Sequence, residues 1–174
     1  MLDFLSRRSI RKFKDISVEK EKVDEILKAV LTAPTGRNSR PCEFVVINDK
    51  DVIKSLDGIR EHGASFLKDA PLVIGVMGDS QKSTTFIPDC SIAAYTIQLK
   101  AHDLGLGSCW IHMLDRKRAD GTSSEEFFKE KVGAPNNLTV LCLIAIGYPD
   151  ENKPKYTEEN MDFNKVSYNR YGNR

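Results

Sequence analysis

One continuous apolar run constrains the fold of this chain more than any other feature. Residues 71–77 carry no charge and are typical of a strand that is buried inside a sheet. Residues 43–48, 106–111 and 138–146 have the composition of three further strands. The chain is therefore expected to build its core around a sheet of four strands.

Helical periodicity predicts helices around these strands. Over residues 18–31 apolar side chains recur at three- and four-residue steps, with Ser17 as a natural N-cap and Pro34 and Gly36 beyond the end. A second strong helical pattern covers residues 89–104, and shorter helices are predicted over residues 2–8, 49–59 and 124–132. Four strands and five helices predict an α+β sandwich with a mixed sheet.

The length of 174 residues indicates a single domain over residues 1–174. Its last segment, residues 150–174, is rich in charge yet contains apolar and aromatic side chains that need a surface to lie on, among them Tyr156, Phe163, Val166, Tyr168 and Tyr171. We expect this extension to pack either on a partner subunit or on its own domain.

Composition excludes several classes of protein. The net charge of +1 gives no overall attraction to nucleic acid, and no apolar run approaches the length that crosses a bilayer. The N-terminus does not resemble a secretory signal. The four cysteines show neither CxxC pairs nor zinc spacing, so we expect reduced thiols, a cytoplasmic protein and no metal.

The sequence shows no self-sufficient catalytic set. GxSxG, P-loop and GxGxxG motifs are absent, the carboxylates are dispersed, and the three histidines lie far apart in sequence. No catalytic residue is therefore predicted. Such a chain either lacks catalysis or takes its chemistry from an organic cofactor.

A basic cluster near the N-terminus favours a cofactor. On the predicted helix Arg7 and Arg11 share a face, with Arg8 and Ser9 at its C-terminal end. Guanidinium groups suit bidentate phosphate contacts, and Ser9 adds a hydrogen bond. The alternative is a solvated helix end, whose cations the helix dipole favours.

Other polar segments allow two interpretations each. The loop with Asn38, Ser39 and Arg40 could bind a ligand or simply connect a helix to a strand. Trp110 is expected in the core, and His112 at a strand end is ambiguous. The turn that begins at Gly147, with the downstream cation Lys155, is a weaker signal.

Taken in order, four motifs resemble the FMN-dependent nitroreductase family. They are the basic segment 7–13, the loop 33–41, Asp89 with its helix leading into residues 105–111, and the turn 146–149. The resemblance implies an α/β/α sandwich with a mixed, mainly antiparallel central sheet. It also implies a homodimer with an FMN at each of two interface sites.

The resemblance also implies roles for individual residues. Arg7, Arg8, Ser9 and Arg11 would hold the phosphate, the ribityl chain and one side of the flavin. Asn38, Ser39 and Arg40 would come from the second subunit, and the backbone around Trp110, Ile111 and His112 would face the flavin ring. Gly147 and Lys155 would close around the phosphate.

The chain departs from the family pattern at two places. Arg40-Pro41-Cys42 stands where the family has Gln-Pro-Trp, and Thr157 stands where larger members carry an arginine after the tail lysine. The roles of Arg40, Cys42 and Thr157 are therefore open, and one phosphate-binding cation is missing.

The implied activity is hydride transfer from NADH or NADPH through FMN to a small electrophile, such as a nitroaromatic or a quinone. Two alternatives remain at this point. One is an FMN-binding carrier or sensor without turnover. The other is specialised flavin chemistry, such as dehalogenation or flavin fragmentation. The motifs do not give the preference between NADH and NADPH or the physiological acceptor. The resemblance implies that variable loops select the acceptor, here residues 80–88 and 116–124.

Overall fold

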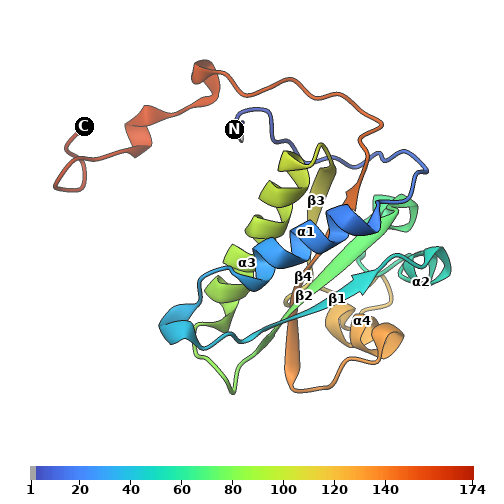
Figure 1. Cartoon of the computed structure of the whole chain (residues 1–174). Helices are drawn as coiled ribbons and strands as arrows, with labels where there is room; N and C mark the ends of the chain where they lie inside the picture. The colour runs from blue at the N-terminus through green and yellow to red at the C-terminus, as the bar shows by residue number, and fades with distance from the viewer. Residues whose placement is uncertain (1–2) are drawn as a thin grey trace.

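The computed structural model describes residues 3–174, which form a four-stranded sheet between two layers of helices (Figure 1). Its strands are β1 (Cys42–Ile47), β2 (Leu72–Asp79), β3 (Gly107–His112) and β4 (Leu138–Gly147). Their order is β1-β2-β4-β3, and each adjacent pair is antiparallel. The four predicted strands are confirmed. The parallel part of the expected mixed sheet is limited to one bridge between Ser9 and Ser108.

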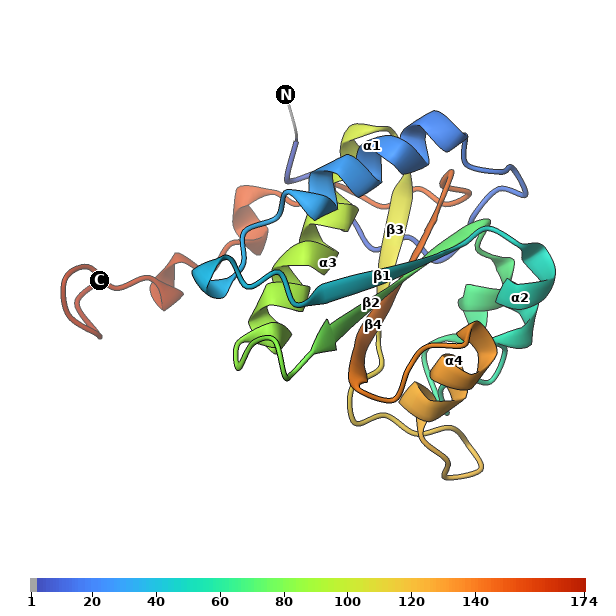
Figure 2. The ribbon, with the colours of Figure 1, turned by 60° about the horizontal axis from the view of Figure 1, so that its bottom comes forward.

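Helices cover both faces of the sheet, as the predicted sandwich requires (Figure 2). Helices α1 (Lys20–Leu31) and α3 (Phe86–Asp103) pack together on one face, and α2 (Lys50–Ser55) and α4 (Ser124–Val132) lie on the other. The strand β2 is buried along its whole length, so its alternate side chains supply both cores.

The two cores are closely packed. Ile74 and Val76 of β2 join Ile26 and Ile97 of the helices on one face. On the other face, Gly75 makes room for Phe128 of α4, because a Cβ on Gly75 would lie 2.6 Å from the Phe128 ring. Burial on both faces explains why β2 reads as a continuous apolar run.

Helices α1 and α3 begin at other residues than predicted, because the N-cap of α1 and the effect of a proline on α3 differ from expectation. Helix α1 begins after Glu19, and Ser17 is not its N-cap. Helix α3 begins three residues earlier than expected because Pro88 fits the first turn, where a helix does not use the amide hydrogen. Helix α4 has the predicted bounds, with Ser123 as N-cap and Gly133 in the left-handed conformation after its end.

The helix predicted over residues 2–8 is wrong for the part that the structure describes. Leu2 lies outside the described residues. From residue 3 to residue 8 the chain forms only a turn at residues 4–6 and then runs extended. The pairing of Ser9 with β3 explains this result, because an extended backbone is needed for such a bridge.

The segment 150–174, which we call the tail, leaves the end of β4 and extends away from the body of the domain (Figure 1). It contains two short 3-10 turns, η3 (Glu158–Asn160) and η4 (Phe163–Lys165). Phe163, Tyr168 and Tyr171 are 69%, 66% and 102% exposed. These aromatic side chains therefore do not pack on their own domain. Within residues 3–174, none of the helices has the length and apolarity needed to span a membrane.

Candidate functional site

The basic N-terminal segment is held between the start of β3 and the chain that leaves β4. The Ile10 amide donates to the Ser108 carbonyl at 3.0 Å, and the Lys14 amide donates to the Tyr148 carbonyl at 2.9 Å. Phe13 also forms an antiparallel bridge with Pro149. The segment therefore acts as a short extra strand, and Arg7 and Arg11 do not share the face of a helix.

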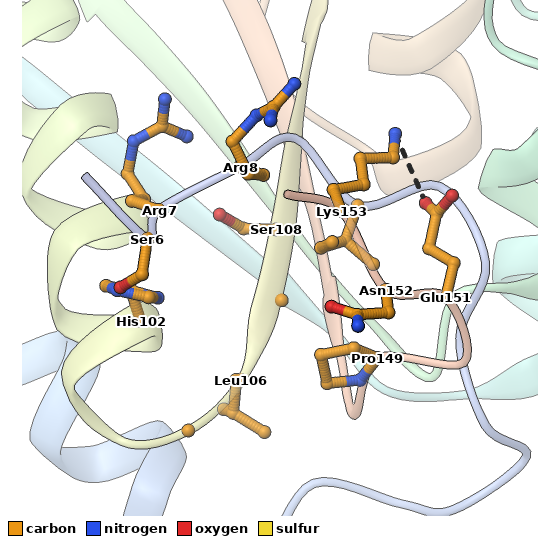
Figure 3. A pocket seen from close by; sticks show the side chains of 13 residues that line it. Ser6, Arg7, Arg8, His102, Leu106, Ser108, Pro149, Glu151, Asn152 and Lys153 are labelled. Atoms are coloured by element: carbon orange, nitrogen blue, oxygen red, sulfur yellow. Dashed lines mark hydrogen bonds and ion pairs between the residues drawn. The ribbon is translucent and has the colours of Figure 1, made fainter. Parts of the chain in front are cut away.

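This pairing creates a cleft of about 260 Å³ at the end of β3. Figure 3 shows Arg7 and Arg8 on one side of Ser108, and Asn152 and Lys153 on the other. Ile10, also in the lining, anchors the segment with only 7% exposure. Three cationic side chains thus surround one small polar cavity.

The three cationic side chains of the cleft differ in the contacts that they make within the described chain. Arg8 donates to the Pro154 carbonyl and lies with its guanidinium 4.5 Å from the centre of the Tyr156 ring. Lys153 donates to the Ser9 carbonyl at 2.8 Å. Within residues 3–174, the Arg7 guanidinium has no hydrogen bond or ion pair. Arg7 therefore has its full set of donors available to a ligand.

Glu151 is the single carboxylate in the lining of the cleft, and its charge is already engaged. It accepts hydrogen bonds from the backbone amides of Arg11 and Lys12, and Lys153 lies 3.5 Å away. The Arg11 amide is the main reason why the pKa of Glu151 is lowered. The cleft therefore keeps a positive character in spite of this acid.

Two predicted phosphate contacts lie differently from expectation. The Lys155 ammonium donates to Asp3 at 2.8 Å and is not part of the cleft lining. At Gly147, a Cβ would lie 2.6 Å from Pro71, so this glycine permits close packing of the chain. Lys153 is the cation that sequence reasoning missed. Its closeness to the Gly147 turn was the available signal, but only the fold shows which tail lysine turns inward.

The Arg11 side chain does not reach the cleft, although the resemblance groups it with Arg7, Arg8 and Ser9. Its guanidinium lies 5.9 Å from the Phe66 ring, and it lines a second, larger cleft of about 510 Å³ with Lys12, Lys50 and Lys54. Ser9 contributes its backbone through the bridge to Ser108 and the bond from Lys153. Both residues stay next to the cleft without entering its lining.

The residues Trp110, Ile111 and His112 lie on β3, which is an edge strand of the sheet. Ile111 is completely buried, whereas the Trp110 and His112 rings are half-buried and stacked, with centroids 6.3 Å apart. Burial is the main cause that lowers the pKa of His112, followed by the nearby Arg116 and Arg60. Beyond Ser108, this edge has no paired strand in the described chain, so its backbone can receive a ligand.

The loop with Asn38, Ser39 and Arg40 is held in an unusual conformation. Arg37, Asn38 and Arg40 have φ angles of 54°, 55° and 47°, in the left-handed region that non-glycine residues avoid. Each non-glycine residue in this conformation lowers the stability of the fold by on the order of 1 kcal/mol. Such residues are concentrated at functional sites. The strained backbone is a reason to regard this loop as a binding element.

Buried polar contacts fix the loop. Asp89 of α3 is 3% exposed and accepts from the Gly36 amide at 2.8 Å and the Thr85 hydroxyl at 3.1 Å. The Arg40 side chain donates to the Asn38 side chain at 3.1 Å. The Ser39 hydroxyl is buried and has no hydrogen-bond partner in the described chain. Such a hydroxyl needs a partner from outside the described chain, either a water or a ligand.

The cleft and the loop lie at different places in the same chain. The loop follows the C-terminal end of α1, and the basic segment lies beyond the other end of this helix (Figure 1). Each half carries a polar group, the Arg7 guanidinium or the Ser39 hydroxyl, that has no partner among residues 3–174. The structure therefore brings Arg7 and Arg8 together in the cleft with Ser9 beside it, but Gly147 is not in the cleft lining, and Asn38, Ser39 and Arg40 lie elsewhere.

Comparison with known proteins agrees with the fold and the motifs. The sequence model of the nitroreductase family matches residues 5–62 and 58–148. A solved FMN-dependent nitroreductase from Clostridium difficile R20291 is 46% identical, with a TM-score of 0.94 over 98% of this chain and 100% of its own. A protein of Methanothermobacter thermautotrophicus, provisionally named NADH dehydrogenase/NAD(P)H nitroreductase, is 35% identical over 84% of this chain and 75% of its own.

A more distant relative has a different activity in its name. The iodotyrosine deiodinase of Thermotoga neapolitana is 24% identical over 86% of this chain and 88% of its own length.

Proposed function

The chain belongs to the nitroreductase family, and from this premise we propose that it is an FMN-dependent oxidoreductase. It would take hydride from NADH or NADPH and pass it to a small electrophile such as a nitroaromatic or a quinone. Bound FMN supplies a reversible two-electron carrier, so the protein needs neither a nucleophile nor a catalytic acid of its own. The observation that carries the proposal is the cationic cleft beside the edge of β3, in which Arg7 has no partner within residues 3–174.

The residues of the cleft fit the phosphate end of such a cofactor. Arg7 offers a guanidinium that has no partner in the described part of the chain, and Arg8, Ser108 and Lys153 supply further donors around the same cavity. Charge-assisted bonds from guanidinium and ammonium groups are the strongest contacts that a phosphate makes in proteins. Arg7 and Arg8 would therefore bind and orient the phosphate, with Lys153 in the role that the motifs gave to Lys155.

The edge of β3 suits the planar end of the cofactor. Backbone groups of Trp110, Ile111 and His112 lie on an unpaired edge, next to the segment that carries Arg11. Backbone amides can donate to a ring nitrogen, and nearby cations stabilise the negative charge that reduction places on the ring. The part of these residues would be to position the ring and to supply this field, while water provides the proton.

We further propose that a second copy of the chain completes the site. The strained loop would approach the ring from the partner subunit, where the unpaired Ser39 hydroxyl and the Asn38 and Arg40 side chains would find their ligand. The exposed aromatic residues of the tail support this arrangement, because Phe163 and Tyr168 need an apolar surface that their own domain does not give them.

An anaerobic reduction experiment tests the proposed function. The purified protein, saturated with FMN and freed of excess, is mixed with NADH or NADPH while the flavin absorbance is recorded. We expect rapid bleaching by one or both nucleotides, and recovery of the absorbance when a quinone or a nitroaromatic is added. Flavin that neither nucleotide reduces would contradict the proposal and favour an FMN carrier or sensor.

Reductive dehalogenation is the second candidate, because the iodotyrosine deiodinase of Thermotoga neapolitana resembles most of this chain. Release of iodide from iodotyrosine by the reduced protein would favour it. Reduction of quinones and nitroaromatics without release of iodide would contradict a dehalogenase function.

A further inference from the structure

Two cysteines lie close enough to react with each other. Cys42 is the first residue of β1, and Cys90 lies in α3; their sulfur atoms are 3.3 Å apart, with the Cys90 thiol donating to Cys42. A disulfide bond is about 2.05 Å long, so the two sulfurs need to approach by only a little over 1 Å.

A glycine makes this contact possible. Gly78 of β2 lies opposite Cys42 in the sheet register. A Cβ on Gly78 would lie 2.8 Å from the Cys90 sulfur and 2.7 Å from the Phe86 ring. Because Gly78 has no side chain, Cys90 can reach through the space over β2 toward the edge strand β1.

The two thiols differ in access and acidity. Cys42 is half-buried and lines a cleft of about 240 Å³ together with Thr35 and Arg40, whereas Cys90 is completely buried. The hydrogen bond from Cys90 lowers the pKa of Cys42, although Asp89 and Glu43 oppose this effect. The same contact and burial raise the pKa of Cys90. An accessible thiol of lowered pKa beside a second thiol is the arrangement of redox-sensitive cysteine pairs.

We propose that Cys42 and Cys90 form a peroxide-reactive thiol pair, in which Cys42 is oxidised first and Cys90 closes a reversible disulfide. This site is separate from the hydride-transfer chemistry of the proposed function, and it does not depend on that function. It also gives a role to Cys42, which stands where the family motif has a tryptophan.

The reaction balances with hydrogen peroxide as the oxidant. The Cys42 thiolate attacks one peroxide oxygen, the O–O bond breaks, and hydroxide leaves and takes up a proton to become water. The resulting Cys42 sulfenic acid is attacked by the Cys90 sulfur; the S–O bond breaks, the S–S bond forms, and a second water leaves with the Cys90 proton. Two thiols are oxidised to a disulfide, and one peroxide is reduced to two waters.

The remaining cysteines serve as internal controls. Cys109 and Cys142 are 2% and 0% exposed, and burial raises the pKa of both thiols. Neither forms a hydrogen bond with another sulfur among the described residues. Both should therefore stay reduced under conditions that oxidise Cys42.

Peptide mapping tests the proposal on the full-length protein. The reduced protein is exposed to a slight excess of hydrogen peroxide, denatured in an alkylating reagent and digested with trypsin. Cleavage after Arg37, Lys50, Lys82 and Lys100 places Cys42 in peptide 38–50 and Cys90 in peptide 83–100. We expect these two peptides to be joined, with a loss of two hydrogens that dithiothreitol reverses, while Cys109 and Cys142 are fully alkylated.

Single variants separate the two roles. In Cys90→Ser, Cys42 should stop as a sulfenic acid that dimedone traps, and in Cys42→Ser the Cys90 thiol should stay reduced. Cys142→Ser should form the same disulfide as the unchanged protein. The proposal is overturned if the unchanged protein gives no joined peptides, if Cys42 is oxidised while Cys90 remains fully alkylated, or if Cys142 reacts as readily as Cys42.

Discussion

At the scale of single residues, Arg7 and Arg8 are neighbours whose guanidinium groups are used differently. Arg8 is held by the Pro154 carbonyl and the Tyr156 ring, and it therefore ties the tail to the N-terminal segment. Arg7 points into the same cleft without a partner in residues 3–174. The proposed phosphate contact should therefore depend most strongly on Arg7, whose removal disturbs few other interactions.

The first prediction concerns Arg7→Ala. Hydrogen bonds to charged groups contribute roughly 1.5–3 kcal/mol, so the Kd for FMN should rise about 10- to 100-fold. Fluorescence titration of FMN measures the change, and the thermal unfolding midpoint should hardly move. Lys20→Ala is the matched control, because the Lys20 side chain is 81% exposed and pairs only with Asp24. Equal FMN affinity in the two variants would contradict a role for Arg7.

The second prediction concerns Asp89→Ala. This change leaves the Gly36 amide and the Thr85 hydroxyl without their buried acceptor. Hydrogen bonds to a charged group contribute roughly 1.5–3 kcal/mol, so the free energy of unfolding in urea should fall by about that amount. Asp103→Ala removes an exposed partner of Lys100 and should have a much smaller effect. A urea midpoint equal to that of Asp103→Ala would show that Asp89 does not hold the loop.

At the scale of elements, the sequence predicted best those helices and strands whose signals lie within their own residues. The run that became β2 and the capped helix α4 could be located because burial on both faces and an N-cap leave local signals. The prediction of a helix over residues 2–8 was wrong because the Ile10 amide, just beyond this segment, pairs with β3. A partner so distant in sequence leaves no local signal. The same reason explains why Lys155 was chosen and Lys153 was missed.

Attachment of the N-terminal segment to β3 leads to the third prediction. A Cβ on Gly107 would lie 2.8 Å from Ile10, so Gly107→Ala should lower the free energy of unfolding by about 1–3 kcal/mol through overpacking. Ile10→Ala should also lower it, because it leaves a cavity. The double variant should be more stable than the sum of the two losses predicts, since alanine at position 10 removes the two γ carbons at 2.8 and 2.9 Å from the added methyl group, although the Cβ at 2.8 Å remains. Purely additive losses would contradict this contact.

The fourth prediction concerns pH and the contact between the tail and the N-terminus. The hydrogen bond from Lys155 is the main cause that lowers the pKa of Asp3 from 3.8 to about 2. Because this pKa is depressed, the contact is fully present above pH 3.8 and is lost as the pH falls through about 2. Carbon NMR of the Asp3 carboxyl group would follow the titration.

Two lysine variants check the cause of that shift. In Lys155→Met the pKa of Asp3 should return toward its ordinary value. Lys153→Met should leave it low, because Lys153 contacts Ser9 and Glu151 and not Asp3. If the pKa of Asp3 stays low in Lys155→Met, the tail is not held at this point.

At the scale of the whole molecule, the candidate site is divided into two halves. The cleft and the β3 edge form one half, and the strained loop with its unpaired Ser39 hydroxyl forms the other. Motif order in the sequence predicted both halves, but spacing along a chain gives no information on which copy supplies each one. The exposed tail poses the same question, since its aromatic residues need a surface from outside their own domain.

A mixed dimer tests the composite FMN site most directly. One chain carries Arg7→Ala and Arg8→Ala, the other carries Asn38→Ala and Ser39→Ala, and two different affinity tags isolate the species that contains both. In the proposed arrangement one of its two sites combines both sets of changes and the other has none, so the mixed dimer should retain about one FMN per dimer. Homodimers of either chain should lose FMN during the same gel filtration. A mixed dimer that retains no more FMN than these homodimers would contradict a site built from two chains.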